Sequence, residues 1–252
     1  MLLRRFTEHV NTQNWLAVGL DFLIVVSGVF IGIQLGNLNQ ARNDRAAETS
    51  YLQRYHEDLS STLDMFDVRL RSIEQQLDEV ENAEKVPTNE EEAWETIRAY
   101  YQISGFSPPE VRTATYADMV SAGRLGLITN ETLRVHIIEH YSRNGAMPIL
   151  NTEQPFRGLV RGVIPHQLQD YLSSADCLEE FETYTACPAP KGDTDLMGLA
   201  TKLRNEEPLR RALNANIAHH RISEQIILSI IGDTAGLREE IAMELGIIDA
   251  SN

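Results

Sequence analysis

Positive charge is scarce in this sequence of 252 residues. Lys and Arg together number 22, whereas Asp and Glu number 37, so the formal net charge is -15 at pH 7. A protein surface of this sign repels the phosphate backbone of DNA and RNA. We therefore expect no nucleic-acid partner for this chain.

Signals for β-strands are also scarce. No run alternates clearly between apolar and polar residues, and no Asn-Gly turn lies between two such runs. The motifs that bind phosphates or dinucleotides, or that present a nucleophilic serine, are missing as well. The sequence therefore favours an all-α fold, with no cofactor and no enzymatic activity.

Cysteine occurs only twice, at Cys177 and Cys187, in a stretch whose exit is rich in Pro and Gly. A loop of this length can be closed by a disulfide without much strain, and we expect the two residues to form one. A disulfide would indicate an oxidising compartment such as the bacterial periplasm. The alternative is a pair of free thiols in a reducing compartment.

The longest apolar run lies near the N-terminus, and Asp21 is its only charged residue. At about 1.5 Å per residue, a helix of this length spans a hydrocarbon core about 30 Å thick. We predict a transmembrane helix over residues 15–38, preceded by a short amphipathic or flexible segment (1–14) and followed by a soluble helical domain (39–252). The expected partners are the lipid bilayer and other transmembrane helices.

Arginines flank this run on both sides, at Arg4 and Arg5 before it and at Arg42, Arg45 and Arg54 after it. The positive-inside rule is therefore close to a tie. A large domain can be translocated regardless of nearby charge, and the cysteine pair favours an oxidising space. We expect a protein of the bacterial inner membrane with a cytoplasmic N-terminus and a periplasmic soluble domain.

One face of the predicted membrane helix collects small and polar residues. At 100° per residue, Gly28, Gly32, Gly36 and Asn39 all lie within about 60° of Asp21. Glycines four residues apart let another helix approach backbone to backbone, and a carboxylate inside a membrane requires a partner, water or the headgroup region. This glycine face predicts packing against another transmembrane helix. The simpler alternative is a glycine-rich anchor that happens to contain Asp21.

Two long helices are predicted in the soluble domain. The first follows the membrane run without Gly or Pro until Pro87, with apolar residues at steps of three and four, and the second opens at Glu206. Shorter helices are expected between them, with start signals at Thr88, Ser107 and Asn130. We predict an antiparallel bundle in which the long first and last helices pair and the short helices pack between them.

The string His136-Ile-Ile-Glu139-His140 is the one pattern that suggests enzyme chemistry. Two histidines four residues apart share a helical face and can bind zinc, with Glu139 as general base and Glu206 or Glu207 as a third ligand. We favour histidines without a metal, because the domain lacks the strands that usually line a protease cleft. The three residues of the string are weak metal candidates only.

A family resemblance is carried by the run NWLAVGLDFLIVVSGVFIGIQLGNLNQAR (14–42) and by the YLQRYHEDL helix (51–59) that follows it. Together they resemble an uncharacterised family of bacterial single-pass membrane proteins, with a domain of unknown function. The segment YADMVSAGRLGLITNETLRVHIIEHY (116–141) is similar to a second recurring block of that family. The resemblance implies an inner-membrane protein and carries over no catalytic residue.

These observations favour a membrane-anchored interaction or structural protein. It would be a homo-oligomer or an accessory subunit of a larger membrane complex, assembled through the glycine face. The alternative is a periplasmic ligand-sensing domain that acts through a partner. A zinc hydrolase at the histidine string is a remote further alternative.

Overall fold

The computed structural model describes residues 15–106, 108–144, 150, 152–174, 177 and 187–247, with side chains from residue 19 onward. Within these residues every regular element is a helix and there is no strand, so the all-α prediction is confirmed. The N-terminal segment predicted for residues 1–14 lies outside the described residues. The chain divides into two compact units, residues 1–51 and 52–252.

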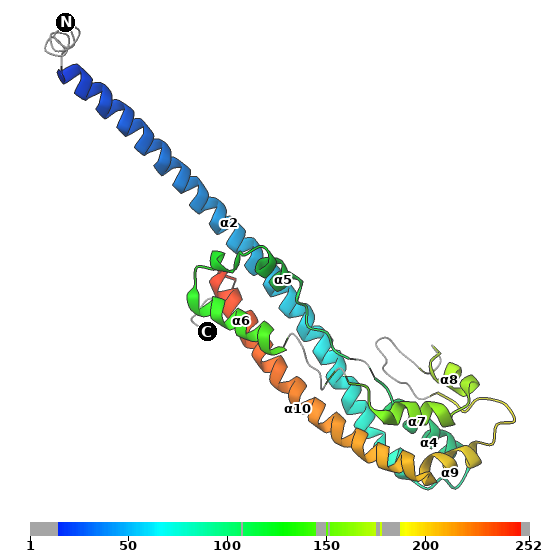
Figure 1. Cartoon of the computed structure of the whole chain (residues 1–252). Helices are drawn as coiled ribbons and strands as arrows, with labels where there is room; N and C mark the ends of the chain where they lie inside the picture. The colour runs from blue at the N-terminus through cyan, green and yellow to red at the C-terminus, as the bar shows by residue number, and fades with distance from the viewer. Residues whose placement is uncertain are drawn as a thin grey trace, which may run out of the picture. The chain divides into compact units, whose positions relative to one another are not determined.

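The first described element is a single long helix, α2 (Trp15–Asp78), shown in blue and cyan in Figure 1. It contains the predicted membrane run and continues into the second unit. Its sequence contains no Pro, and no Gly after the glycine face, so nothing interrupts its backbone hydrogen bonds.

The C-terminal end of helix α2 lies earlier in the chain than the sequence predicts. We predicted that it extends to the residues before Pro87, but α2 stops at Asp78 and a short helix, α3 (Val80–Glu84), follows. After this break α3 packs on the next helix of the chain. There the hydroxyl of Thr96 donates a hydrogen bond to the carbonyl of Asn82 at 3.3 Å.

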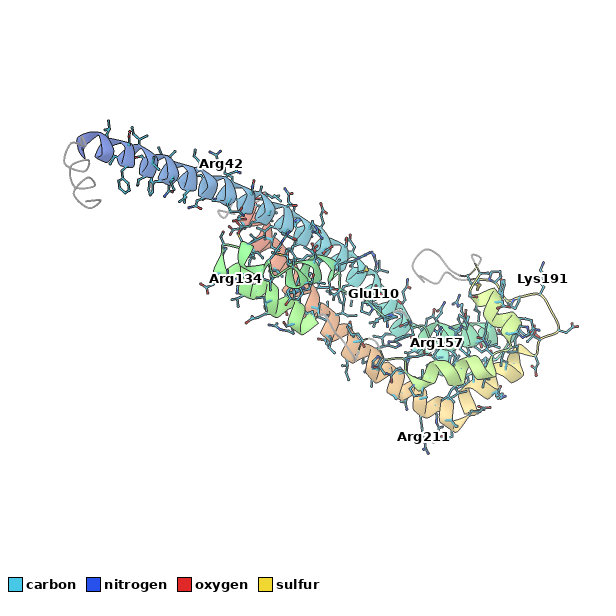
Figure 2. The ribbon with its side chains drawn as sticks, turned by 45° about the horizontal axis from the view of Figure 1, so that its top comes forward. Arg42, Glu110, Arg134, Arg157, Lys191 and Arg211 are labelled. Carbon is cyan, nitrogen blue, oxygen red and sulfur yellow. A yellow bond between two sulfur atoms is a disulfide. The ribbon has the colours of Figure 1, made fainter. Side chains whose placement is uncertain are left out.

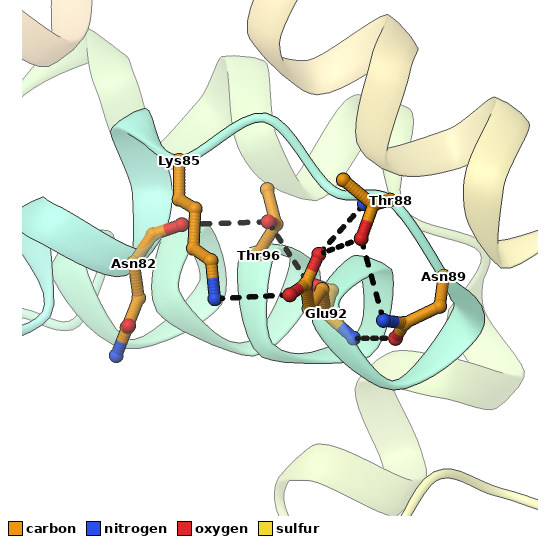
Figure 3. Close-up of polar contacts among 6 residues, drawn as sticks. All are labelled: Asn82, Lys85, Thr88, Asn89, Glu92 and Thr96. Carbon is orange, nitrogen blue, oxygen red and sulfur yellow. Dashed lines mark hydrogen bonds and ion pairs between the residues drawn. The ribbon is translucent and has the colours of Figure 1, made fainter.

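Helix α4 (Glu90–Ile103) begins with a network of side-chain caps, drawn in Figure 3. Asn89 accepts a hydrogen bond from the N–H of Glu92 at 2.9 Å, and the Glu92 carboxylate accepts the hydroxyl and the N–H of Thr88, each at 2.7 Å. The hydrogen bonds from Thr88, with Lys85 at 3.2 Å, lower the pKa of Glu92 to about 2. The start signal at Thr88 thus acts one residue later, because Asn89 is the cap and Thr88 binds the carboxylate.

A helix was predicted to begin directly after α4, at Ser107, but the described residues between α4 and the next helix are not helical. The expected start at Ser107 lies outside the described residues, residues 108–113 form no helix, and α5 (Ala114–Ser121) begins later. Two consecutive prolines disfavour helical geometry in the residue before each of them. In addition, the N–H of Arg112 donates to the hydroxyl of Thr62 on α2 at 3.1 Å, which holds the stretch against that helix.

Helix α6 (Glu131–Asn144) starts at Asn130, where a cap was predicted. The side-chain oxygen of Asn130 accepts the N–H of Leu133 at 3.2 Å. Before it, α5 ends at Ser121 and is followed by Gly123, whose φ of +65° favours glycine, and a short 3-10 helix, η1 (Leu125–Leu127), makes the connection.

The remaining described elements are four further helices: α7 (Pro155–Val163), α8 (His166–Leu172), α9 (Leu196–Asn205) and α10 (Glu207–Glu244). Pro165 separates α7 from α8, because its ring prevents one continuous helix. The predicted last long helix is α10, with Pro208 in its first turn. Its two internal glycines, Gly232 and Gly236, do not interrupt it.

Buried apolar side chains form hydrophobic clusters between the helices of the second unit, and two of these clusters bear on the site. The larger joins α4, α7, α8, α9 and the start of α10, and includes Trp94, Ile97, Phe156, Leu172 and Leu203. In the smaller, Phe66 and Ile73 of α2 pack with Ile227 and Ile230 of α10. The residues from 52 to 78 and α10 accordingly lie side by side in Figure 1.

Candidate functional site

The apolar part of α2 carries large side chains that the described chain does not cover. Every described side chain from residue 19 to 43 is exposed, and Phe22 and Phe30 are 70% and 61% exposed. Among the described residues, one helix, formed by this stretch, is long and apolar enough to cross a membrane, by length and composition. Side chains of this kind are normally buried in a water-soluble domain.

The predicted glycine face lies within this exposed stretch. A Cβ atom added at Gly28, Gly32 or Gly36 would meet no other atom within 4 Å. Asp21 and Asn39 are exposed as well, and neither makes a hydrogen bond or an ion pair within the described part of the chain. The face therefore offers open glycines that a second helix can approach closely, with Ile24 and Leu35 exposed on or near the same face.

The histidine string lies on α6, where it faces α10 across a groove of about 330 Å³. His136 Nδ1 lies 2.7 Å from an oxygen of Glu240, and this hydrogen bond raises the pKa of His136. His140 is buried, burial lowers its pKa, and its ring packs edge-on against Tyr141. The two histidines thus occupy different surroundings.

No group of three His, Cys, Asp or Glu side chains is placed to hold a metal ion in the described part of the chain. Glu206 and Glu207, considered as third zinc ligands, pair instead with Lys202 at 3.7 Å and with Arg211 at 2.8 Å. The geometry at the string is that of a helix interface.

Two further polar bridges flank the His136–Glu240 pair and tie α6 to α10. Asn130 donates to Glu244 at 2.7 Å, and Arg143 donates to Asp233 at 3.0 Å. Gly232 and Gly236 form the open floor of the groove between them, since an added Cβ would meet no atom within 4 Å.

A larger cavity, of about 500 Å³, lies between α2 and the extended stretch that precedes α5. Sequence reasoning missed it, because the paired prolines were interpreted as a helix start. Glu110, labelled in Figure 2, stands on this stretch. The cavity is lined by Ser61, Asp64, Met65, Val68, Arg69, Ser72, Pro108, Pro109 and Glu110.

The last residue of α4 and the two residues after it are bound by side chains from three other helices. The carbonyl of Ile103 accepts from Asn216 at 2.9 Å, that of Ser104 from Arg157 at 3.2 Å, and that of Gly105 from Gln76 at 3.2 Å. The donors lie on α10, α7 and α2.

His220 is buried beside Asn216, and its Nε2 lies 3.2 Å from the carbonyl oxygen of Ile103. Burial lowers the pKa of His220 to about 4.

The two cysteines form a disulfide, with their Cα atoms 4.9 Å apart. Both are buried in the larger hydrophobic cluster. The indole of Trp94 donates to the carbonyl of Cys187 at 2.9 Å, and the hydroxyl of Tyr171 donates to the carbonyl of Pro188 at 3.0 Å. The residues after the bridge are thereby attached to α4 and α8.

Comparison with known proteins assigns no function to these residues. The resemblance of residues 14–42, 51–59 and 116–141 to a bacterial single-pass family stays a prediction. No protein-family model, no curated protein and no solved structure matches the chain.

Proposed function

We propose that this chain is a membrane-anchored interaction protein. Residues 15–38 would cross the bacterial inner membrane, the glycine face would pack against other transmembrane helices, and the helical domain would lie in the periplasm as an antiparallel bundle. The partner helices belong either to further copies of the chain or to a larger membrane complex.

A single observation carries the proposal: the apolar stretch of α2 is exposed on all sides. Apolar side chains contribute roughly 25 cal/mol per Å² when they leave water, so a stretch of this length is strongly driven into a bilayer or a protein interface. The open glycine face then supplies the close contact that membrane helices use in place of the hydrophobic effect.

The assembly part of the proposal is tested by the mass and composition of the particle extracted from native membranes in mild detergent. We expect a particle larger than the monomer, and Gly32→Leu should reduce it to the monomer because the side chain blocks close approach. Gly19→Leu is the matched control, since Gly19 is also open but lies on the opposite face.

The composition of the particle separates the two kinds of partner. A multiple of one chain would identify a homo-oligomer, and other subunits at a fixed ratio would identify an accessory role. A wild-type particle of monomer mass, or a Gly32→Leu particle unchanged in size, would contradict assembly through the glycine face.

The orientation is tested with reporters fused after Asn252. Alkaline phosphatase folds to its active form in the periplasm, whereas green fluorescent protein fluoresces in the cytoplasm. We expect an active phosphatase fusion and a dark fluorescent fusion. The opposite pair of results would place the domain in the cytoplasm and overturn this part of the proposal.

A further inference from the structure

The 500 Å³ cavity is built by an extended strap that α2 holds at two places. We use "strap" for residues 108–113, which precede α5. Just before the strap begins, the side chain of Gln76 on α2 donates a hydrogen bond to the carbonyl of Gly105 at 3.2 Å. At its other end, the N–H of Arg112 donates to the hydroxyl of Thr62 on α2 at 3.1 Å, and the N–H of Thr115, in the first turn of α5, donates to the carboxylate of Asp58 at 3.2 Å. The cavity lies between these attachment points, so its walls are fixed on both sides.

The walls of the cavity are largely apolar. Met65 and Val68 of α2 are half-buried, and Pro108 and Pro109 of the strap face them across the cavity. Proline has no N–H group, so this part of the strap presents no unsatisfied donor to an apolar ligand. A cavity of this size lies within the range of small-molecule sites, which is about 300 to 1,000 Å³.

The charged lining residues that are exposed to the solvent are both acidic. Asp64 and Glu110 are both exposed, one from α2 and one from the strap. Neither makes a hydrogen bond or an ion pair within the described residues. A ligand that places a positive group between them gains two attractions and displaces no protein partner.

The one positive residue of the lining, Arg69, is turned toward the interior. It is buried, and its guanidinium donates to Ser72 at 3.5 Å. Burial lowers the pKa values of His219 and His220 on α10, and the charge of Arg69 lowers them further. Arg69 also lines a small pocket with His219 and His220 of α10, whereas Asp64 and Glu110 are exposed to the solvent.

We propose that this cavity binds a small organic amine: an apolar body lies between α2 and the strap, and the ammonium group lies between Asp64 and Glu110. The inference concerns the second unit alone and does not depend on how the chain is anchored. An apolar body accounts for the Met, Val and Pro walls. A positive end accounts for the two carboxylates.

The test uses three probes of one shape and different charge: 4-phenylbutylamine, 4-phenylbutan-1-ol and 4-phenylbutyrate. The full-length chain, in nanodiscs and with ¹³C-methyl methionine, is titrated with each probe. The methyl signal of Met65 reports the cavity, and that of the fully buried Met119 serves as an internal reference. Assignment by Met65→Leu separates binding in the cavity from partition into the bilayer.

We expect the amine to shift the Met65 signal saturably, and to bind about fivefold or more tightly than the alcohol, which is the gain expected from two exposed ion pairs. Asp64→Asn with Glu110→Gln should reduce the amine to the affinity of the alcohol. Asp64→Lys with Glu110→Lys should make the butyrate the tightest probe. Glu74→Gln, an exposed carboxylate on α2 outside the cavity, should change nothing.

Three results would overturn the proposal. The first is no saturable shift of the Met65 signal with the amine. The second is equal affinity for the amine and the alcohol in the wild-type chain. The third is an amine affinity that the Asp64 and Glu110 substitutions leave unchanged while the Met119 signal shows that the fold is intact.

Discussion

At the scale of single residues, His220 is the side chain whose ionisation bears most directly on stability. It is 2% exposed, lies 2.9 Å from the amide nitrogen of Asn216, and has a pKa lowered by burial to about 4. A histidine in the unfolded chain takes up a proton near pH 6.5. Between these values the unfolded state binds the proton and the folded state does not.

We therefore predict that acidification destabilises the second unit through His220. Stability is unaffected above pH 6.5 and falls as the pH drops toward 4, by about 3 kcal/mol in all. Urea unfolding at a series of pH values measures this loss, and His220→Gln should remove it from the profile. His219→Gln, at the less buried neighbour, should remove less. Parallel profiles for the wild type and His220→Gln would contradict the assignment.

At the scale of elements, the α6–α10 interface contains the titratable pair His136–Glu240 and two further polar contacts, Asn130–Glu244 and Arg143–Asp233. His136 has a raised pKa, chiefly because of its hydrogen bond to Glu240, and Glu139 contributes least of the named causes. The pair stabilises the interface below the ordinary histidine pKa, and this contribution is lost as the pH rises through the raised value.

An NMR titration of the His136 ring measures this pKa directly. We predict a value above 6.5 in the wild type and a return toward 6.5 in Glu240→Gln. Glu139→Gln, which removes the same charge from the same helix as the histidine, should shift the pKa much less. If Glu139→Gln had the larger effect, the hydrogen bond to Glu240 would not be the cause.

Sequence patterns predicted the elements better than their ends. The presence of the two long helices α2 and α10, and the cap at Asn130, follow from periodicity and local capping chemistry, whereas α2 ends at Asp78 and not before Pro87. The helix expected from Ser107 failed, because α2 holds the strap in an extended form through contacts between distant residues. The cavity was missed for the same reason, since Asp64 and Glu110 converge only after folding.

At the scale of the whole molecule, the disulfide constrains a chain that is otherwise held by helix packing. The bridge from Cys177 to Cys187 closes a loop with a sequence separation of 10. Reduction should lower the free energy of unfolding by about 3 kcal/mol, mainly because the reduced unfolded chain is less restricted.

Unfolding in detergent with and without reductant measures this difference. The double variant Cys177→Ser with Cys187→Ser is the control, and its stability should match that of the reduced wild type and ignore the reductant. A wild-type chain whose unfolding is the same in both conditions would show that the bridge contributes nothing to stability.

The capped end of α4 has a consequence for how the protein is made. The carbonyl of Ile103 receives its donor from Asn216, 113 residues later in the chain. During synthesis α4 therefore leaves the ribosome long before Asn216 is made, and water must hydrogen-bond to the carbonyl of Ile103 in the meantime. Gln76 and Arg157, which bind the carbonyls of Gly105 and Ser104, are made before α10, so a chain stalled before Glu207 lacks only the donor for the carbonyl of Ile103 among these three bonds.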